Sequence, residues 1–121
     1  MNTQIPISYT YDPEADAILI KTKNYEHETT IQLNNNVIMD LNQKREFIAL
    51  EILSASHVLD TTIESLENIS SVNLIVKVTD YQIFLSAVFA LPVHDHEEVK
   101  TTNASIINNI NIPLMETIAT A

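Results

Sequence analysis

The stretch IPISYTYDPEADAILIKT, residues 5–22, decides what kind of fold the chain can adopt. Apolar and polar side chains alternate from Ile5 to Tyr11, which is the period of a half-buried strand. A second apolar run follows at 17–22. The residues between the runs have turn chemistry, because Pro13 fixes φ and the Asp12 carboxylate can accept hydrogen bonds from backbone N–H groups nearby. The stretch therefore predicts a β-hairpin within an antiparallel sheet.

The same linker raises a calcium alternative. Asp12, Glu14 and Asp16 have the spacing of the first three ligands of an EF-hand loop. The place of the required glycine is taken by Ala17, however, and the place of the bidentate glutamate by Lys23. We therefore interpret the three carboxylates as turn-forming groups that face water.

Three further strands are expected at 29–33, 37–41 and 46–53, separated by short polar loops. Short loops predict antiparallel neighbours. In the last strand Glu51 interrupts an apolar face, where it could be a buried catalytic acid with a raised pKa. We favour an edge position or a cross-strand pair with a lysine. Because the chain has no glycine, loop asparagines such as 34–36 are expected to supply left-handed turn conformations.

The pattern changes after residue 57. The T-x-x-E sequence of residues 61–64 is typical of a capping box, and the apolar stripe that follows predicts one short helix at about 62–70. Two strongly β-prone runs then predict a second β-hairpin at about 72–91. Both faces of this hairpin are apolar, which favours a covered sheet or a subunit interface, and so a homodimer. The predicted fold class is α+β, with a mainly antiparallel β meander of about five strands, one helix and the second hairpin.

The length of 121 residues predicts one domain, which we place at residues 1–99. Residues 100–121 are low in charge and rich in Thr, Asn and Ile. This segment could add a strand or a short hairpin around Asn108 and Asn109, but we expect a C-terminal arm that binds a partner or a second copy.

Charge and composition restrict the function classes. Sixteen acidic against six basic side chains give a net charge of −10, so we expect neither nucleic acid nor a membrane surface as a partner. A basic protein partner, or a plain role of the charge in solubility, fits better, and the solubility role is the more common of the two. The absence of glycine and cysteine excludes a P-loop, a dinucleotide fingerprint and a thiolate site. The N-terminus lacks the pattern of a secretory signal, and the longest nearly apolar run, 83–93, is too short to span a membrane, so a cytoplasmic location is expected.

The densest group of potential ligands is VHDHEE, residues 93–98. His94 and His96 would share one face of an extended chain. Zinc requires three or four ligands, and the third could be His57, Asp95, Glu97 or a residue from another chain. We interpret the segment as a solvated acidic loop and predict no metal, no cofactor and no catalytic residue. His57 is interpreted as a structural or surface residue.

The order of these elements resembles the family called domain of unknown function 2283. The resemblance covers about residues 9–57 and rests on YDPEADAILI, NNNVIMDLN and EFIALEIL followed by SAS. It implies a compact, mainly antiparallel prokaryotic domain with no established activity and no catalytic residues to carry over. Some members resemble the antitoxin half of toxin–antitoxin pairs. The characteristic positions are Tyr11, Asp12, Asp16, Asp40, Glu51, Ile52 and Leu53, whereas Asn36, Arg45 and Ala49 stand where the family usually has glycine.

One function and two alternatives are therefore expected. The first is a non-enzymatic protein-interaction module, antitoxin-like, in which the acidic loops 12–16 and 95–98 attract a basic partner and the apolar surface of 72–91 supplies the buried contact. The second is a metal-dependent hydrolase or lyase that uses His94, His96 and a distant acid. The third is a homodimeric structural protein.

Overall fold

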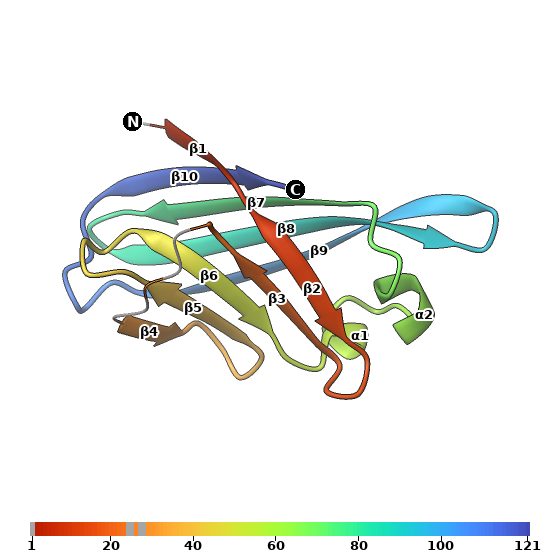
Figure 1. The fold of residues 1–121 in the computed structure, drawn as a ribbon. Coiled ribbons are helices and arrows are strands. Elements are labelled where there is room, and N and C mark those ends of the chain that lie inside the picture. The colour runs from red at the N-terminus through yellow and green to blue at the C-terminus, as the bar shows by residue number, and fades with distance from the viewer. Residues whose placement is uncertain (1, 24–25, 27–28) are drawn as a thin grey trace.

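The computed structural model describes residues 2–23, 26 and 29–121. This part of the chain forms strands in two facing sheets and two short helices (Figure 1). The elements are β1 (Asn2–Pro6), β2 (Ser8–Asp12), β3 (Ala17–Lys21), β4 (Thr29–Gln32), β5 (Val37–Leu41), β6 (Phe47–Ile52), α1 (Ala55–Val58), α2 (Ile63–Leu66), β7 (Ser71–Val78), β8 (Gln82–Val93), β9 (His96–Ile107) and β10 (Met115–Thr120).

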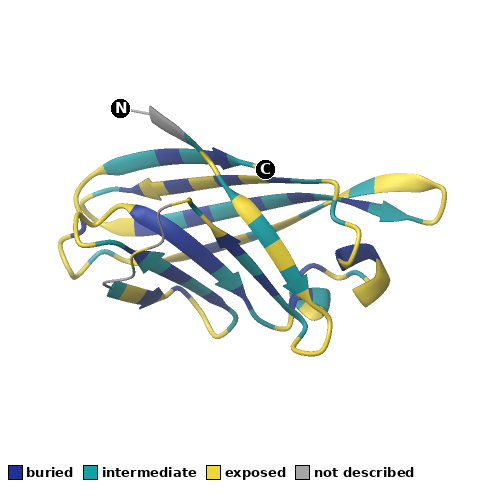
Figure 2. Cartoon of the chain, in the orientation of Figure 1, coloured by how far each residue is buried: buried dark blue, intermediate teal, exposed yellow. Residues whose placement is uncertain are grey.

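The fold is a β-sandwich rather than the single meander and hairpin expected from the sequence. The larger sheet has the order β1-β10-β7-β8-β9, and the smaller sheet has the order β2-β3-β6-β5-β4. Neighbouring strands are antiparallel, as predicted, except that β1 and β10 are parallel. The inner faces of both sheets meet in one core, and Figure 2 shows the buried positions alternating along the strands. Its largest fully buried side chains include Ile18, Ile20, Leu50, Leu74, Leu85 and Phe89.

The expected first strand, from Ile5 to Tyr11, is divided between the two sheets. Ile5 pairs with Ala119 in the larger sheet, whereas Tyr9 pairs with Ile20 in the smaller sheet. The chain crosses at Ile7, whose N–H still donates to the Thr120 carbonyl at 3.2 Å. Alternate residues pack against the same core on both sides of the crossing, so the hydrophobic period continues unchanged and hides the change of sheet.

The helical content differs from the prediction in length and number. The helix expected at 62–70 is the single turn α2, and its cap is Thr62, not Thr61, because the Thr62 Oγ1 accepts a hydrogen bond from the Ser65 N–H at 3.1 Å. A further helix, α1, was not expected from the sequence and follows Ser54, which has a φ of 52°. No helix among the described residues is long and apolar enough to span a membrane.

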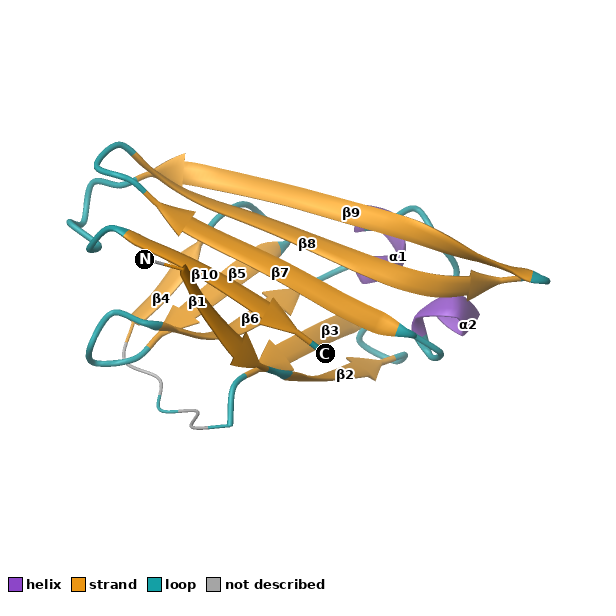
Figure 3. Ribbon diagram, turned by 90° about the horizontal axis from the view of Figure 1, so that it is seen from above, coloured by secondary structure: helices purple, strands orange, loops and turns teal. Residues whose placement is uncertain are grey.

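The hairpin expected at 72–91 is formed by β7 and β8, and β8 continues to Val93. Residues 100–121 do not form the expected arm. Their first part completes β9, and β10 lies between β7 and β1 inside the larger sheet. The strands β8 and β9 reach beyond the smaller sheet and cover α2 (Figures 1 and 3). A sequence low in charge and rich in Thr and Asn is equally typical of a strand with one wet face.

Candidate functional site

The β2–β3 turn adopts the geometry that its sequence predicts. The Asp12 Oδ1 accepts hydrogen bonds from the N–H groups of Glu14 at 3.0 Å and Ala15 at 3.3 Å. The Glu14 side chain is exposed to water. Among the described residues, the three carboxylates do not gather into a group that could hold a metal ion, as calcium ligands would.

Asp16 joins this turn to α1. Its carboxylate accepts hydrogen bonds from the Tyr11 hydroxyl at 2.7 Å, the Ser56 hydroxyl at 2.7 Å and the Ser56 N–H at 3.0 Å. Its backbone carbonyl accepts another from the Ala55 N–H at 2.8 Å. Asp16 has a left-handed φ of 52°, a conformation that aspartate tolerates better than most residues. The Asp16 cluster, which we define as Tyr11, Asp16 and Ser56, therefore holds the turn against the helix.

The same contacts shift the acidity of the Asp16 cluster. Partial burial acts to raise the pKa of Asp16, but the hydrogen bonds from Ser56 and Tyr11 outweigh it and hold that pKa below its usual value. Burial and the hydrogen bond to Asp16 raise the pKa of Tyr11 well above its usual value. A carboxylate with a lowered pKa is a weak proton acceptor, so it does not activate Ser56 as a nucleophile. The cluster has the chemistry of a structural support.

Three segments that are distant in sequence lie at the same end of the sandwich, on the right in Figures 1 and 3. They are the turn 12–16, the helical segment 55–67 and the hairpin tip 93–98, which we together call the acidic end. The Asp16 cluster connects the first two. The Ser65 hydroxyl holds the second beside the third by donating at 2.7 Å to the carbonyl of Pro92, the residue just before the tip. These segments contain no Lys or Arg. Their nine acidic residues are Asp12, Glu14, Asp16, Asp60, Glu64, Glu67, Asp95, Glu97 and Glu98.

The expected pairing of His94 and His96 on one face is not formed. His94 has a left-handed φ of 55° in the tip of the β8–β9 hairpin, whereas His96 is already in β9. The His96 Nε2 lies 3.7 Å from a carboxylate oxygen of Glu98. Asp95 and the His57 side chain are exposed. Within the described ranges, no three His, Asp or Glu side chains gather where they could hold a metal ion.

Glu51 lies elsewhere than expected. Its strand, β6, is the middle strand of the smaller sheet and not an edge. Glu51 is half-buried on the outer face, and its register neighbours are Leu19 and Ile38 rather than a lysine.

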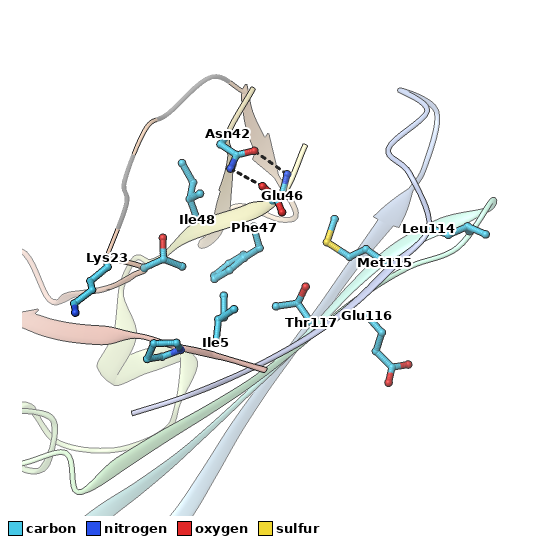
Figure 4. A pocket seen from close by; sticks show the side chains of 12 residues that line it. Ile5, Lys23, Asn42, Glu46, Phe47, Ile48, Leu114, Met115, Glu116 and Thr117 are labelled. Carbon is cyan, nitrogen blue, oxygen red and sulfur yellow. Dashed lines mark hydrogen bonds between the residues drawn. The ribbon is translucent and has the colours of Figure 1, made fainter. Parts of the chain in front are cut away.

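A pocket of about 610 Å³ opens at the end of the sandwich opposite the acidic end. It lies between β1 and β10 of the larger sheet and β6 of the smaller sheet (Figure 4). Ile5, Phe47 and Met115 supply much of its apolar wall. This pocket was not expected from the sequence, because its lining residues come from both ends and the middle of the chain and no local spacing connects them.

Comparisons with known proteins give a relative that matches most of the chain and a family model that matches its N-terminal part. A protein from Methanosarcina mazei named "Putative hypoxanthine phosphoribosyltransferase" is 28% identical over 106 residues, which span 88% of this chain and 85% of that protein. No solved structure matches the chain. A family model matches a stretch that begins with β2, contains every strand of the smaller sheet and ends inside α1, so the stretch includes the whole Asp16 cluster. As the sequence indicates for about residues 9–57, residues 8–56 match the family described as protein of unknown function DUF2283.

Proposed function

We propose that this protein is an interaction module that binds a basic protein partner at its acidic end. The observation that carries the proposal is the convergence on one end of the sandwich of three separate segments that contain no Lys or Arg. Lys100, just beyond the tip, lies 3.9 Å from Glu98 and offsets one of their nine negative charges. Carboxylates gathered in this way produce a negative potential that attracts a cationic surface and accelerates association.

The acidic end has the rigidity that a recognition surface needs. The Asp16 cluster fixes the turn 12–16, and the bond from Ser65 to Pro92 fixes α2 under the hairpin tip. The carboxylates of Glu14, Glu64 and Asp95 are exposed, so they remain available to a partner. Each segment contributes three acidic residues, and exposed charges are screened over about 8 Å at physiological salt, so the attraction should weaken as salt is added.

An antitoxin-like role is the finer form of this proposal. It is supported by the resemblance of residues 8–56 to the DUF2283 family and by the net charge of −10. A toxin that binds nucleic acid or a phosphorylated substrate carries a basic surface. An acidic surface of complementary shape would cover that surface in the cytoplasm of a prokaryotic cell.

The name of the archaeal relative points to a different function, phosphoribosyl transfer. Proteins commonly hold phosphates with glycine-rich loops at helix N-termini. This chain has no glycine, and α1 and α2 are four residues long. The geometry of the described residues therefore gives this activity no support, and we do not propose it for this chain.

Capture from native cells tests the proposal. Because the chain has no cysteine, a Ser105→Cys variant can be immobilised through one exposed position on β9, which leaves the acidic end free. One bait carries Glu14→Gln, Glu64→Gln and Asp95→Asn. The matched control makes the same change in charge outside the acidic end, with Glu26→Gln, Glu46→Gln and Asp80→Asn.

The proposal predicts that the unchanged bait and the control bait retain the same basic protein at defined stoichiometry, and that added salt releases it. The acidic-end bait loses most of that partner. Equal retention by all three baits would contradict the proposal.

The outer face of the larger sheet favours a second candidate, self-association. Ile75 is 43% exposed there, and Ile118 lies opposite it on β10. Phe84 and Val88, its diagonal neighbours on β8, are half-buried. No described element covers this apolar patch, and isologous packing of two patches would form a two-fold dimer. Sizing by light scattering is expected to give a dimer that Ile75→Lys converts to a monomer, and a monomer at all concentrations would reject the dimer.

A further inference from the structure

The pocket opposite the acidic end has an apolar interior and a polar rim (Figure 4). Phe47 and Ile5 extend toward each other from facing sheets, and Thr117 and Met115 line the side formed by β10. Glu116 is turned away from them, as the alternation of β10 requires. The volume of about 610 Å³ lies within the usual range for small-molecule sites, roughly 300–1,000 Å³.

The polar groups of the rim are largely satisfied. The Asn42 side-chain N–H donates to the Glu46 carboxylate at 3.1 Å, and the Asn42 Oδ1 accepts from the Glu46 N–H at 3.0 Å. Glu46 and Lys23 are both exposed and carry opposite charges. The rim therefore gives no net preference for an anion or a cation.

Thr117 differs from the rim residues. It is 8% exposed, so it is one of the few buried polar side chains, and it lies on the pocket wall. Its hydroxyl makes no hydrogen bond with any other residue that the structure describes. No fully buried side-chain oxygen or nitrogen among the described residues lacks a partner, so the unbonded Thr117 oxygen is reached by solvent from the pocket that it lines. It is therefore positioned to bond a molecule inside the pocket.

We propose that this pocket binds a small, uncharged and mainly apolar molecule that carries one hydrogen-bonding oxygen, such as an alcohol or a ketone. The apolar body replaces water against Ile5, Phe47 and Met115. The oxygen of the ligand pairs with the Thr117 hydroxyl. Lys23 and Glu46, the charged residues of the rim, are both exposed to water, whereas Thr117 is buried. A carboxylate or an ammonium group beside Thr117 would therefore lose water without a buried charge as its partner, which is strongly unfavourable.

Displacement of a neutral fluorescent probe, N-phenyl-1-naphthylamine, tests this site. Competitors of equal chain length separate the ligand classes: 1-decanol, decanoate and decylamine. Two variants alter the pocket. Thr117→Val removes the hydroxyl and keeps the shape of the side chain. Leu114→Trp enlarges a side chain on the rim, and because Leu114 is 68% exposed, the larger ring should not disturb the fold. Thr102→Val on β9 is the control because Thr102 does not line the pocket.

The expected result is saturable one-to-one binding of the probe, displaced by 1-decanol at least ten times more effectively than by decanoate or decylamine. Thr117→Val is expected to weaken the binding of 1-decanol by roughly 2- to 12-fold, which corresponds to the loss of one neutral hydrogen bond, and to leave the binding of the probe unchanged. Leu114→Trp should weaken the binding of the probe and of 1-decanol, and Thr102→Val should change neither affinity. Three results would each overturn the proposal: no saturable binding to the folded protein, equal competition by the charged compounds, or an affinity that neither Thr117→Val nor Leu114→Trp changes. Loss of this binding would leave partner capture at the acidic end unchanged, because the two sites lie at opposite ends.

Discussion

Replacing Asp16 by asparagine is expected to destabilise the protein by about 2 kcal/mol. The carboxylate accepts three hydrogen bonds from Tyr11 and Ser56. Bonds to a charged acceptor contribute about 1 kcal/mol more each than neutral bonds. Because Asp16 is only half-buried, water can replace part of the lost hydrogen bonding, which lowers the expected loss of stability to about 2 kcal/mol. Asparagine keeps one acceptor oxygen and tolerates the left-handed φ of 52°. Alanine loses every acceptor and adds a left-handed cost of about 1 kcal/mol, for a total of about 4 kcal/mol.

Urea denaturation followed by circular dichroism measures the loss, and the melting temperature should fall by about 8 °C in Asp16→Asn. The matched control is Asp12→Asn, because an asparagine Oδ1 can accept the same two backbone hydrogen bonds in the turn. The control should change the free energy of unfolding by less than about 0.5 kcal/mol. An Asp16→Asn loss as small as that of the control would refute the role assigned to the Asp16 cluster.

The pH dependence of this loss has a defined sign. The pKa of Asp16 is lower in the folded protein than in the unfolded chain, so the folded state binds fewer protons. Its contribution to stability is complete above the unfolded pKa of about 3.9 and is lost as the pH falls through the folded pKa. The difference between wild type and Asp16→Asn should therefore be larger at pH 7 than at pH 3. A difference that grows on acidification would contradict the shift.

Three further predictions concern other contacts. Phe89→Ala should cost about 3–5 kcal/mol in urea denaturation because Phe89 is fully buried between the sheets, and a loss below about 1 kcal/mol would contradict its place in the core. Ser65→Ala should cost about 1–2 kcal/mol by leaving the Pro92 carbonyl without its 2.7 Å donor, and hydrogen exchange at the hairpin tip should rise with it. Tyr11→Phe should remove the step at highest pH from a spectrophotometric tyrosine titration, because the pKa of Tyr11 is raised by burial and by Asp16; persistence of that step would disprove the assignment.

Local chemistry predicted the parts of the fold that depend on neighbours in sequence. The alternation around Ile5 and the turn residue Asp12 gave a strand and a hairpin turn at the right places. The division of the first strand at Ile7 was not predictable, because both sheets bury residues of the same parity. The position of β10 was missed for a related reason: its partners, β1 and β7, are fixed by long-range pairing rather than by composition.

The candidate sites follow the same division. The acidic loops were recognisable from sequence, but only the fold brings the turn 12–16 and the tip 93–98 to one end. The role of Asp16 as a bridge depends on Ser56, forty residues away, which no local pattern reveals. Thr117 falls in the segment expected to form a partner-binding arm, and its burial follows from its register opposite Val76 in the larger sheet.

The most direct test of the central claim is the association rate of the captured basic partner, measured by stopped flow at low and at physiological salt. Steering by the acidic end predicts that Glu14→Gln, Glu64→Gln and Asp95→Asn together slow association by about tenfold and flatten its salt dependence, with little change in the dissociation rate. The control with the same net charge, Glu26→Gln, Glu46→Gln and Asp80→Asn, should associate nearly as fast as the wild type. Equal association rates and equal salt dependence for the two variants would contradict the claim that the acidic end is where the partner binds.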